Sequence, residues 1–259
     1  MHTVEPKVFL IAETGVVDGM RDMLVAIGAE KWNVPFDTQS DGEALVEVAG
    51  RLCYKSFGTE LNANLTKVRE GNKNYIGNIL KTKHGSVLEH ANVSIGFIDV
   101  SRIFTHELVR HRSGCAYSQE SMRFVRLEDI GMYIPECIEN DPIALKAFQL
   151  AVVNAEESYE ELVKLMIRDD MPFAKKKEIT SAIRRIAPGG HKTNIIVTAN
   201  HRAWRHMIEL RTAEGAEEEI RKAFFQVADL FAVRYPSIYQ DMTVPSDMGA
   251  PILFDNSKI

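Results

Sequence analysis

Three arginines and a histidine gather in the middle of the sequence, around a segment rich in hydroxyl and amide side chains. The run Arg110-His111-Arg112 is followed shortly by Ser118-Gln119-Glu120-Ser121-Met122-Arg123. Guanidinium groups bind phosphate through charge-assisted and often paired hydrogen bonds, and hydroxyl and amide groups add neutral partners. We therefore expect this segment to hold a phosphate together with an anionic ring, as a nucleotide-handling active site requires.

The residues just before this segment extend the candidate site. Glu107, Arg110 and His111 are spaced at i, i+3 and i+4, so on one continuous helix they share a face. A solvated charged stripe is the alternative, and spacing alone leaves the two interpretations equal. His106-Glu107 resembles the start of a zinc-binding HExxH helix, but Arg110 occupies the position of the second histidine. Its positive charge repels a metal ion, so we predict no metal site.

Two further segments carry similar chemistry. Residues 84–90 place two histidines, a hydroxyl and a carboxylate at a helix-to-strand junction, where spacing alone favours a capped turn over a cofactor-binding rim. Arg202, Arg205, His206 and Glu209 share one face of a later helix at i, i+3, i+4 and i+7. On the opposite face, Trp204 is expected to pack in the core and not to serve as a stacking platform.

The hydrophobic pattern predicts the elements that position these groups. We expect strands over 8–12, buried, over 91–100, half-buried, and over 193–198. We expect helices over 16–27, 41–52, about 65–81, 142–168, 174–186, 201–211 and 216–233. Asp41 is expected to cap the helix over 41–52, and Ser101 to cap a further helix that runs into the Arg-His-Arg run. The tail from Pro236 has no clear pattern. Because no linker or repeat interrupts the chain, we predict a single α+β domain over residues 1–259.

Composition limits the class of protein. The 259 residues are 45% hydrophobic and 26% charged, with a formal net charge of −5, which disfavours a general nucleic-acid or membrane-surface binder. Three widely separated cysteines suggest neither a disulfide framework nor a zinc site. The first residues do not read as a signal peptide, and no stretch approaches the roughly 18 apolar residues of a membrane span. We expect a cytoplasmic enzyme without nucleic-acid or membrane partners.

Taken together, the motifs resemble the flavin-dependent thymidylate synthases (ThyX) over about residues 51–221. The family motif is Arg-His-Arg, seven residues, then serine, usually with arginine two residues later. Here Arg110-His111-Arg112 is followed by eight residues and then by Ser121 and Arg123. Other segments match in the same order: His84-x-Ser86-x-x-Glu89-His90, Arg184-x-x-x-Pro188, Asn200-x-Arg202-x-x-x-His206 and Arg211. Four ordered segments make the resemblance specific.

The resemblance implies a small antiparallel sheet flanked by helices, in a homotetramer whose active sites form between subunits. It implies methylation of dUMP at carbon 5 to give dTMP, with FAD, NADPH as reductant and 5,10-methylenetetrahydrofolate as carbon donor. Arg211 would be catalytic, stabilising the ionised uracil ring. The implied nucleotide-binding residues are Glu107, Arg110, Gln119, Ser121, Arg123, Arg184 and Arg211. The implied flavin-binding residues are His84, Ser86, Glu89, Arg110, His111, Arg112, Asn200, Arg202 and His206.

The sequence departs from the family pattern at a few positions. One extra residue lies within residues 113–116, Glu107 stands where many members have glutamine, and Gly215 stands where histidine is usual. A sugar pocket remodelled by the insertion would accept a 2′-hydroxyl, so a UMP methylase, or another pyrimidine-nucleotide carbon-5 alkylase of this type, is the close alternative. An RNA- or single-strand-binding module is disfavoured by the acidic charge and the lack of interleaved aromatics. An inactive homologue retained for assembly is disfavoured by the presence of Arg211, Arg184 and Ser121.

Overall fold

An antiparallel sheet forms the centre of the molecule. The computed structural model describes residues 1–32, 38–58, 67–123 and 129–257. Its four-stranded sheet has the order β2-β3-β6-β4, with bounds Lys7–Glu13, Asn92–Ser101, Lys192–Asn200 and Cys115–Gln119. The two central strands pair with Ile95 opposite Val197 and Phe97 opposite Ile195. Apolar β-branched and aromatic side chains at these positions explain why β3 and β6 are the buried centre of the sheet.

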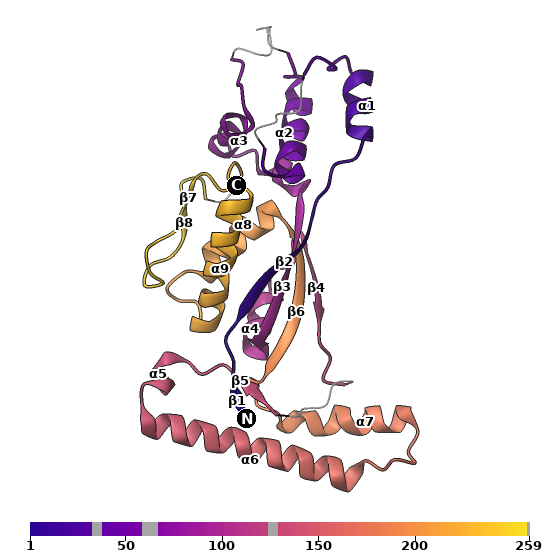
Figure 1. Cartoon of the computed structure of the whole chain (residues 1–259), viewed down its shortest axis with the longest axis vertical. Helices are drawn as coiled ribbons and strands as arrows, with labels where there is room; N and C mark the ends of the chain where they lie inside the picture. The colour runs from indigo at the N-terminus through magenta and orange to yellow at the C-terminus, as the bar shows by residue number, and fades with distance from the viewer. Residues whose placement is uncertain (33–37, 59–66, 124–128, 258–259) are drawn as a thin grey trace.

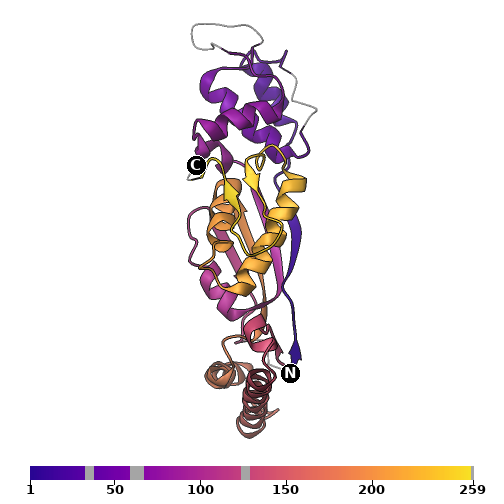
Figure 2. The same ribbon diagram turned by 90° about the vertical axis from the view of Figure 1, so that its left-hand side faces the viewer.

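Helices cover one face of the sheet and both of its ends (Figures 1 and 2). α8 (His201–Arg211) and α9 (Glu218–Arg234) lie on the covered face. The bounds of the helices at one end are α1 Gly19–Ala26, α2 Asp41–Tyr54 and α3 Asn72–Lys81. At the other end lie α6 (Pro142–Met166) and α7 (Phe173–Ile183). None of the described helices is long and apolar enough to cross a bilayer.

Several short elements complete the chain. Their bounds are β1 His2–Thr3, η1 Gly85–Glu89, α4 Arg102–Leu108, β5 Gly131–Met132, α5 Glu136–Glu139, η2 Arg184–Ile186, β7 Met242–Thr243 and β8 Leu253–Phe254. β1 pairs with β5, and β7 pairs with β8.

The main core lies between the sheet and the two helices that cover it. Phe97, Trp204, Phe224 and Phe231 are fully buried there, and the Trp204 indole nitrogen donates to the carbonyl of Val93 at 3.1 Å. The prediction that Trp204 packs in the core is therefore confirmed. Because Trp204 belongs to α8, this packing fixes the opposite face of the helix, which carries the candidate site.

Most predicted elements are present, with seven corrections. The strand expected to be buried, over 8–12, is β2, an edge strand whose Phe9 and Ile11 are exposed because nothing described covers that face. The helix expected over 16–27 begins only at Gly19. The cap of α2 is Ser40, not Asp41, because the Ser40 hydroxyl accepts from the Glu43 amide, whereas the Asp41 carboxylate accepts from the amide of Val16.

The remaining corrections concern α3, α4, the tail and the segment after the Arg-His-Arg run. The helix expected over 65–81 begins at Asn72, and residues 65–66 lie outside the described part of the chain. α4 ends at Leu108, before the Arg-His-Arg run. The tail expected to be irregular contains β7 and β8. The segment after the Arg-His-Arg run, expected to be a loop, forms edge strand β4.

Candidate active site

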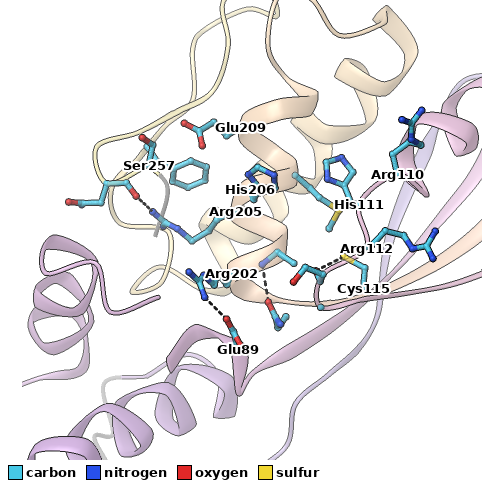
Figure 3. A pocket seen from close by; sticks show the side chains of 17 residues that line it. Glu89, Arg110, His111, Arg112, Cys115, Arg202, Arg205, His206, Glu209 and Ser257 are labelled. Carbon is cyan, nitrogen blue, oxygen red and sulfur yellow. Dashed lines mark hydrogen bonds and ion pairs between the residues drawn. The ribbon is translucent and has the colours of Figure 1, made fainter. Parts of the chain in front are cut away.

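A pocket opens between the Arg-His-Arg turn, α8 and the C-terminal segment (Figure 3). Its cavity is about 400 Å³, within the usual range for small-molecule sites. It is lined by seven of the residues predicted to bind the flavin: Glu89, Arg110, His111, Arg112, Asn200, Arg202 and His206. Ten lining residues were not among those predicted to bind the flavin, although Arg205 and Glu209 were placed on one helical face with Arg202: Ser113, Gly114, Cys115, Ala203, Arg205, Met207, Glu209, Phe254, Asn256 and Ser257.

α8 supplies one wall of the pocket. Its first residue follows Asn200, whose side-chain oxygen caps the helix by accepting from the Ala203 amide at 2.9 Å. Arg202, Arg205, His206 and Glu209 line the cavity together, as the helical spacing predicts. The polar face of α8 thus lines a pocket.

Arg211 is fixed at the end of α8 by three acceptors. Its Nη1 donates to the Glu107 carboxylate at 2.8 Å, its Nη2 to the Glu107 carbonyl oxygen at 2.8 Å, and its Nε to His111 Nε2 at 2.9 Å. Because His111 accepts from a cation, its ring must be neutral. Burial, together with the nearby charge of Arg211 and the ring of His206, lowers the pKa of His111 to about 4. Arg211 does not line the cavity itself but lies beside it, next to His111.

The turn that carries His111 is held by a tyrosine. The Tyr117 hydroxyl lies within hydrogen-bond distance of the carbonyl oxygens of His111 and Leu108, at 2.5 and 3.2 Å. Since α4 ends at Leu108, Arg110 does not share a helical face with Glu107, which corrects the expected spacing. The side chains of Arg110 and Arg112 are exposed at the rim, and neither forms an ion pair with a described residue.

The extra residue of the Arg-His-Arg motif lies in the turn before β4. Gly114 has φ +70°, and a Cβ there would lie 2.5 Å from Nδ2 of Asn200. Only glycine fits this combination of left-handed backbone and close approach. Within one chain, the insertion therefore lines the same pocket as residues predicted for the flavin.

A buried carboxylate fixes the start of α4, the helix that carries Glu107. Ser101 caps this helix by accepting from the Phe104 amide, as predicted. Glu219 of α9 accepts from the Ser101 amide at 2.5 Å and from the Ser101 hydroxyl. Burial raises the pKa of Glu219 to about 7, although both hydrogen bonds from Ser101 favour the ionised form.

Two residues of the predicted flavin segment do not reach the pocket. His84 stacks on Tyr54 with ring centroids 5.4 Å apart, and Ser86 is exposed in η1. Neither lines the cavity. From this segment Glu89 does so, through its ion pair with Arg202. The segment forms the short helix η1, which has no side-chain cap.

Four further residues lie toward α7, at the other end of the sheet, and we call them the arginine cluster: Arg102, Ser121, Arg123 and Arg184. The Arg123 amide donates to the Ser121 hydroxyl, and its Nε donates to Ser181 of α7, both at 3.3 Å. Burial and the charge of Arg184 lower the pKa of Arg102. Gln119 at the end of β4 is held by Thr105, at 2.9 Å. None of the four cluster residues lines the pocket.

The predicted nucleotide-binding residues are thus split between two places. Glu107 and Arg211 lie beside the pocket, whereas Ser121, Arg123 and Arg184 lie near α7. Arg102 was not singled out from the sequence, although it directly follows the predicted helix cap Ser101. Among the described residues, no group of three or more histidine, cysteine, aspartate or glutamate side chains is arranged to hold a metal ion.

The fold has a solved counterpart. The structure described as a UMP/dUMP methylase PolB from Streptomyces cacaoi bound with 5-Br dUMP covers 93% of this chain and 96% of its own, with a TM-score of 0.65. The two sequences are 17% identical, so this likeness concerns the fold. The class is a mixed helix-and-sheet protein with a small antiparallel sheet.

The sequence comparisons define the family within this class. The family described as "Thymidylate synthase complementing protein" (Thy1) matches residues 36–237. The flavin-dependent thymidylate synthases of Mycolicibacterium vanbaalenii and Mycobacterium tuberculosis are each 38% identical over 217 residues, which is 82% of this chain and 84% of theirs. The chain belongs to this family and is an enzyme, as the motifs predicted.

Proposed function

We propose that this enzyme methylates dUMP at carbon 5 to give dTMP, with FAD, NADPH and 5,10-methylenetetrahydrofolate. The observation that carries the proposal is the arrangement of Arg211, held by Glu107 and His111 beside a pocket lined by the predicted flavin residues. The names of its sequence relatives support the same reaction.

The residues of the pocket fit a flavin dinucleotide. Arg110 and Arg112 at the rim suit a diphosphate, and Asn200 and His206 offer neutral hydrogen-bonding groups. A bound flavin supplies hydride transfer, which side chains cannot perform. The protein's part is to bind and orient the reactants, because Cys115, the cysteine of the pocket, has a pKa raised by burial and is no ready nucleophile.

Arg211 is suited to stabilise an ionised uracil ring. A guanidinium has five N–H groups, and three of them are used by Glu107 and His111. The two that are left, one on each Nη atom, can donate to the imide edge of a pyrimidine. This interaction strengthens as negative charge develops on the ring, so it favours the reacting state over the ground state.

The arginine cluster is the proposed phosphate site. Several cations facing one dianion give strong charge-assisted binding, even in a chain of net charge −5. Because Ser121, Arg123 and Arg184 do not share a pocket with Arg211 in one chain, we propose that a second copy completes each active site, within a homotetramer.

The first test is tritium release from carbon 5 of labelled dUMP and of labelled UMP, each with FAD, NADPH and 5,10-methylenetetrahydrofolate. We expect release from dUMP. Release from UMP alone, or faster than from dUMP, would instead assign the enzyme to ribonucleotide methylation. Release from neither would contradict the proposed reaction.

A further inference from the structure

The C-terminal segment forms one side of the pocket. Phe254 of β8 and the following Asn256 and Ser257 line the cavity, yet the family match ends at residue 237. These three residues are therefore a part of the candidate site that the shared family sequence does not include. In Figure 3, Ser257 and Arg110 lie on opposite sides of His206, so the segment faces the Arg-His-Arg turn across the pocket.

A buried ion pair fixes this segment to α8. Arg205 donates to the Asp241 carboxylate at 2.7 and 3.0 Å, to the Ile238 carbonyl at 2.7 Å and to the Asn256 carbonyl at 3.4 Å. Its guanidinium lies over the Phe254 ring, with 4.2 Å to the ring centroid. Asp241 also accepts from the Asn256 side-chain amide at 2.9 Å. These contacts orient the segment before any ligand binds.

The positive charge of Arg205 is therefore neutralised within the protein. Four of its five N–H groups have acceptors, and Asp241 neutralises it. Glu209 adds a carboxylate to the same side of the pocket. This side repels a phosphate and instead offers a hydroxyl, an amide oxygen and an aromatic ring. Such groups suit an uncharged partner that carries amino or hydroxyl groups and a flat ring.

The position of Arg211 decides which part of the flavin lies here. Arg211 bonds to His111, on the side of the pocket away from Ser257, so the reactive flavin ring belongs on that side. We propose that Phe254, Asn256 and Ser257 bind the adenosine half of FAD and give the enzyme its preference for FAD over FMN, an inference that rests on the proposed function.

The test compares FAD and FMN binding, because FMN lacks the adenosine half. Purified protein freed of flavin is titrated with each flavin by fluorescence, as wild type and as the double variant Asn256→Ala with Ser257→Ala. We expect the variant to lose about tenfold in FAD affinity, the loss of about one good hydrogen bond, with unchanged FMN affinity. Asp255→Asn is the matched control, since Asp255 is an exposed neighbour that does not line the pocket.

The outcomes are distinguishable. A double variant whose FAD and FMN affinities fall equally, or whose FAD affinity is unchanged, would overturn the role of this segment while leaving flavin dependence intact. A wild-type protein that binds neither flavin would overturn the proposed function and this inference with it. Circular dichroism of the variant confirms that Phe254 and the Arg205–Asp241 pair still hold the fold.

Discussion

The arginines of α8 and those of the arginine cluster differ in how their charge is used. Arg202, Arg205 and Arg211 of α8 are each paired with a carboxylate of the same chain. In the cluster, no ion pair joins Arg123 or Arg184 to any described residue. A paired guanidinium is held in one orientation, which suits recognition of a ring, whereas unpaired guanidinium groups keep their charge for a dianion that arrives from solution.

The largest effect should come from the paired arginine beside the pocket. Arg211→Ala removes the donors proposed for the uracil imide, so we expect kcat to fall by at least about a thousandfold, with flavin still bound. Arg211→Lys should not restore activity, because an ammonium group cannot reproduce the fork of two Nη donors. Steady-state kinetics and the flavin absorbance of the purified protein measure the two quantities. Turnover close to that of the wild type would refute the role of Arg211.

The unpaired arginines of the cluster should affect the affinity for dUMP. Arg184→Ala removes a cation from the phosphate site, and we expect dUMP affinity to fall by about 10- to 100-fold with unchanged FAD affinity. This loss should be smaller at high salt, because ions screen the attraction between Arg184 and the phosphate in the wild-type protein. Isothermal titration with dUMP at two salt concentrations measures this. Arg185→Ala on the same turn is the control, and an equal loss in that variant would argue against a specific site.

The turn before β4 should be sensitive to the addition of a single methyl group at Gly114. Gly114→Ala introduces a Cβ at φ +70° next to Asn200, so it disturbs both the backbone and the cap of α8. We expect FAD affinity to fall by about tenfold, the equivalent of roughly 1.4 kcal/mol. Gly19→Ala is the control, because nothing lies within 4 Å of its added Cβ. Unchanged flavin binding in Gly114→Ala would place the turn outside the cofactor site.

The buried carboxyl of Glu219 should make the stability of the protein depend on pH. The pKa of Glu219 is raised to about 7 in the folded protein, so between about pH 4.5 and 7 the folded state binds more protons than the unfolded state. The free energy of unfolding should therefore fall as pH rises through this window. Glu219→Gln should remove that contribution, on the order of 3 kcal/mol across the window.

Thermal unfolding of both proteins between pH 5 and 8 tests the sign. The exposed Glu214→Gln is the control. If the wild type and Glu219→Gln show the same slope of Tm with pH, the buried carboxyl does not hold its proton in the folded state.

The sequence predicted the helical part of the site better than the rest. The 3.6-residue period placed Arg202, Arg205 and His206 on one face, because that face follows from local geometry. The strand β4 was missed, since the Cys115–Gln119 sequence has no apolar alternation and gains its order by pairing with β6. Asp241 could not be predicted as the partner of Arg205, since it lies 36 positions away in a segment of two-residue strands.

The same limit applies to the division of the nucleotide-binding residues. Motif order along the chain says that Arg184 and Arg211 belong to one family pattern, but it says nothing about which copy of the chain presents each of them. In three dimensions η2, which carries Arg184, lies beside α7, and Arg211 lies at the end of α8 (Figure 1). Distance in the fold, and not spacing in the sequence, supports the proposal that a second copy completes the site.

The register of the central strands has a consequence for how the chain folds. β3 and β6 pair residues about a hundred positions apart, such as Ile95 with Val197, and the α6–α7 hairpin lies between them in the sequence. Closing so long a loop is slow, whereas α6 needs only local contacts. During refolding of a Trp32→Phe variant, helical circular dichroism should therefore recover before the fluorescence of Trp204, whose indole is bonded to β3. The core behind the pocket is among the last parts of this protein to form.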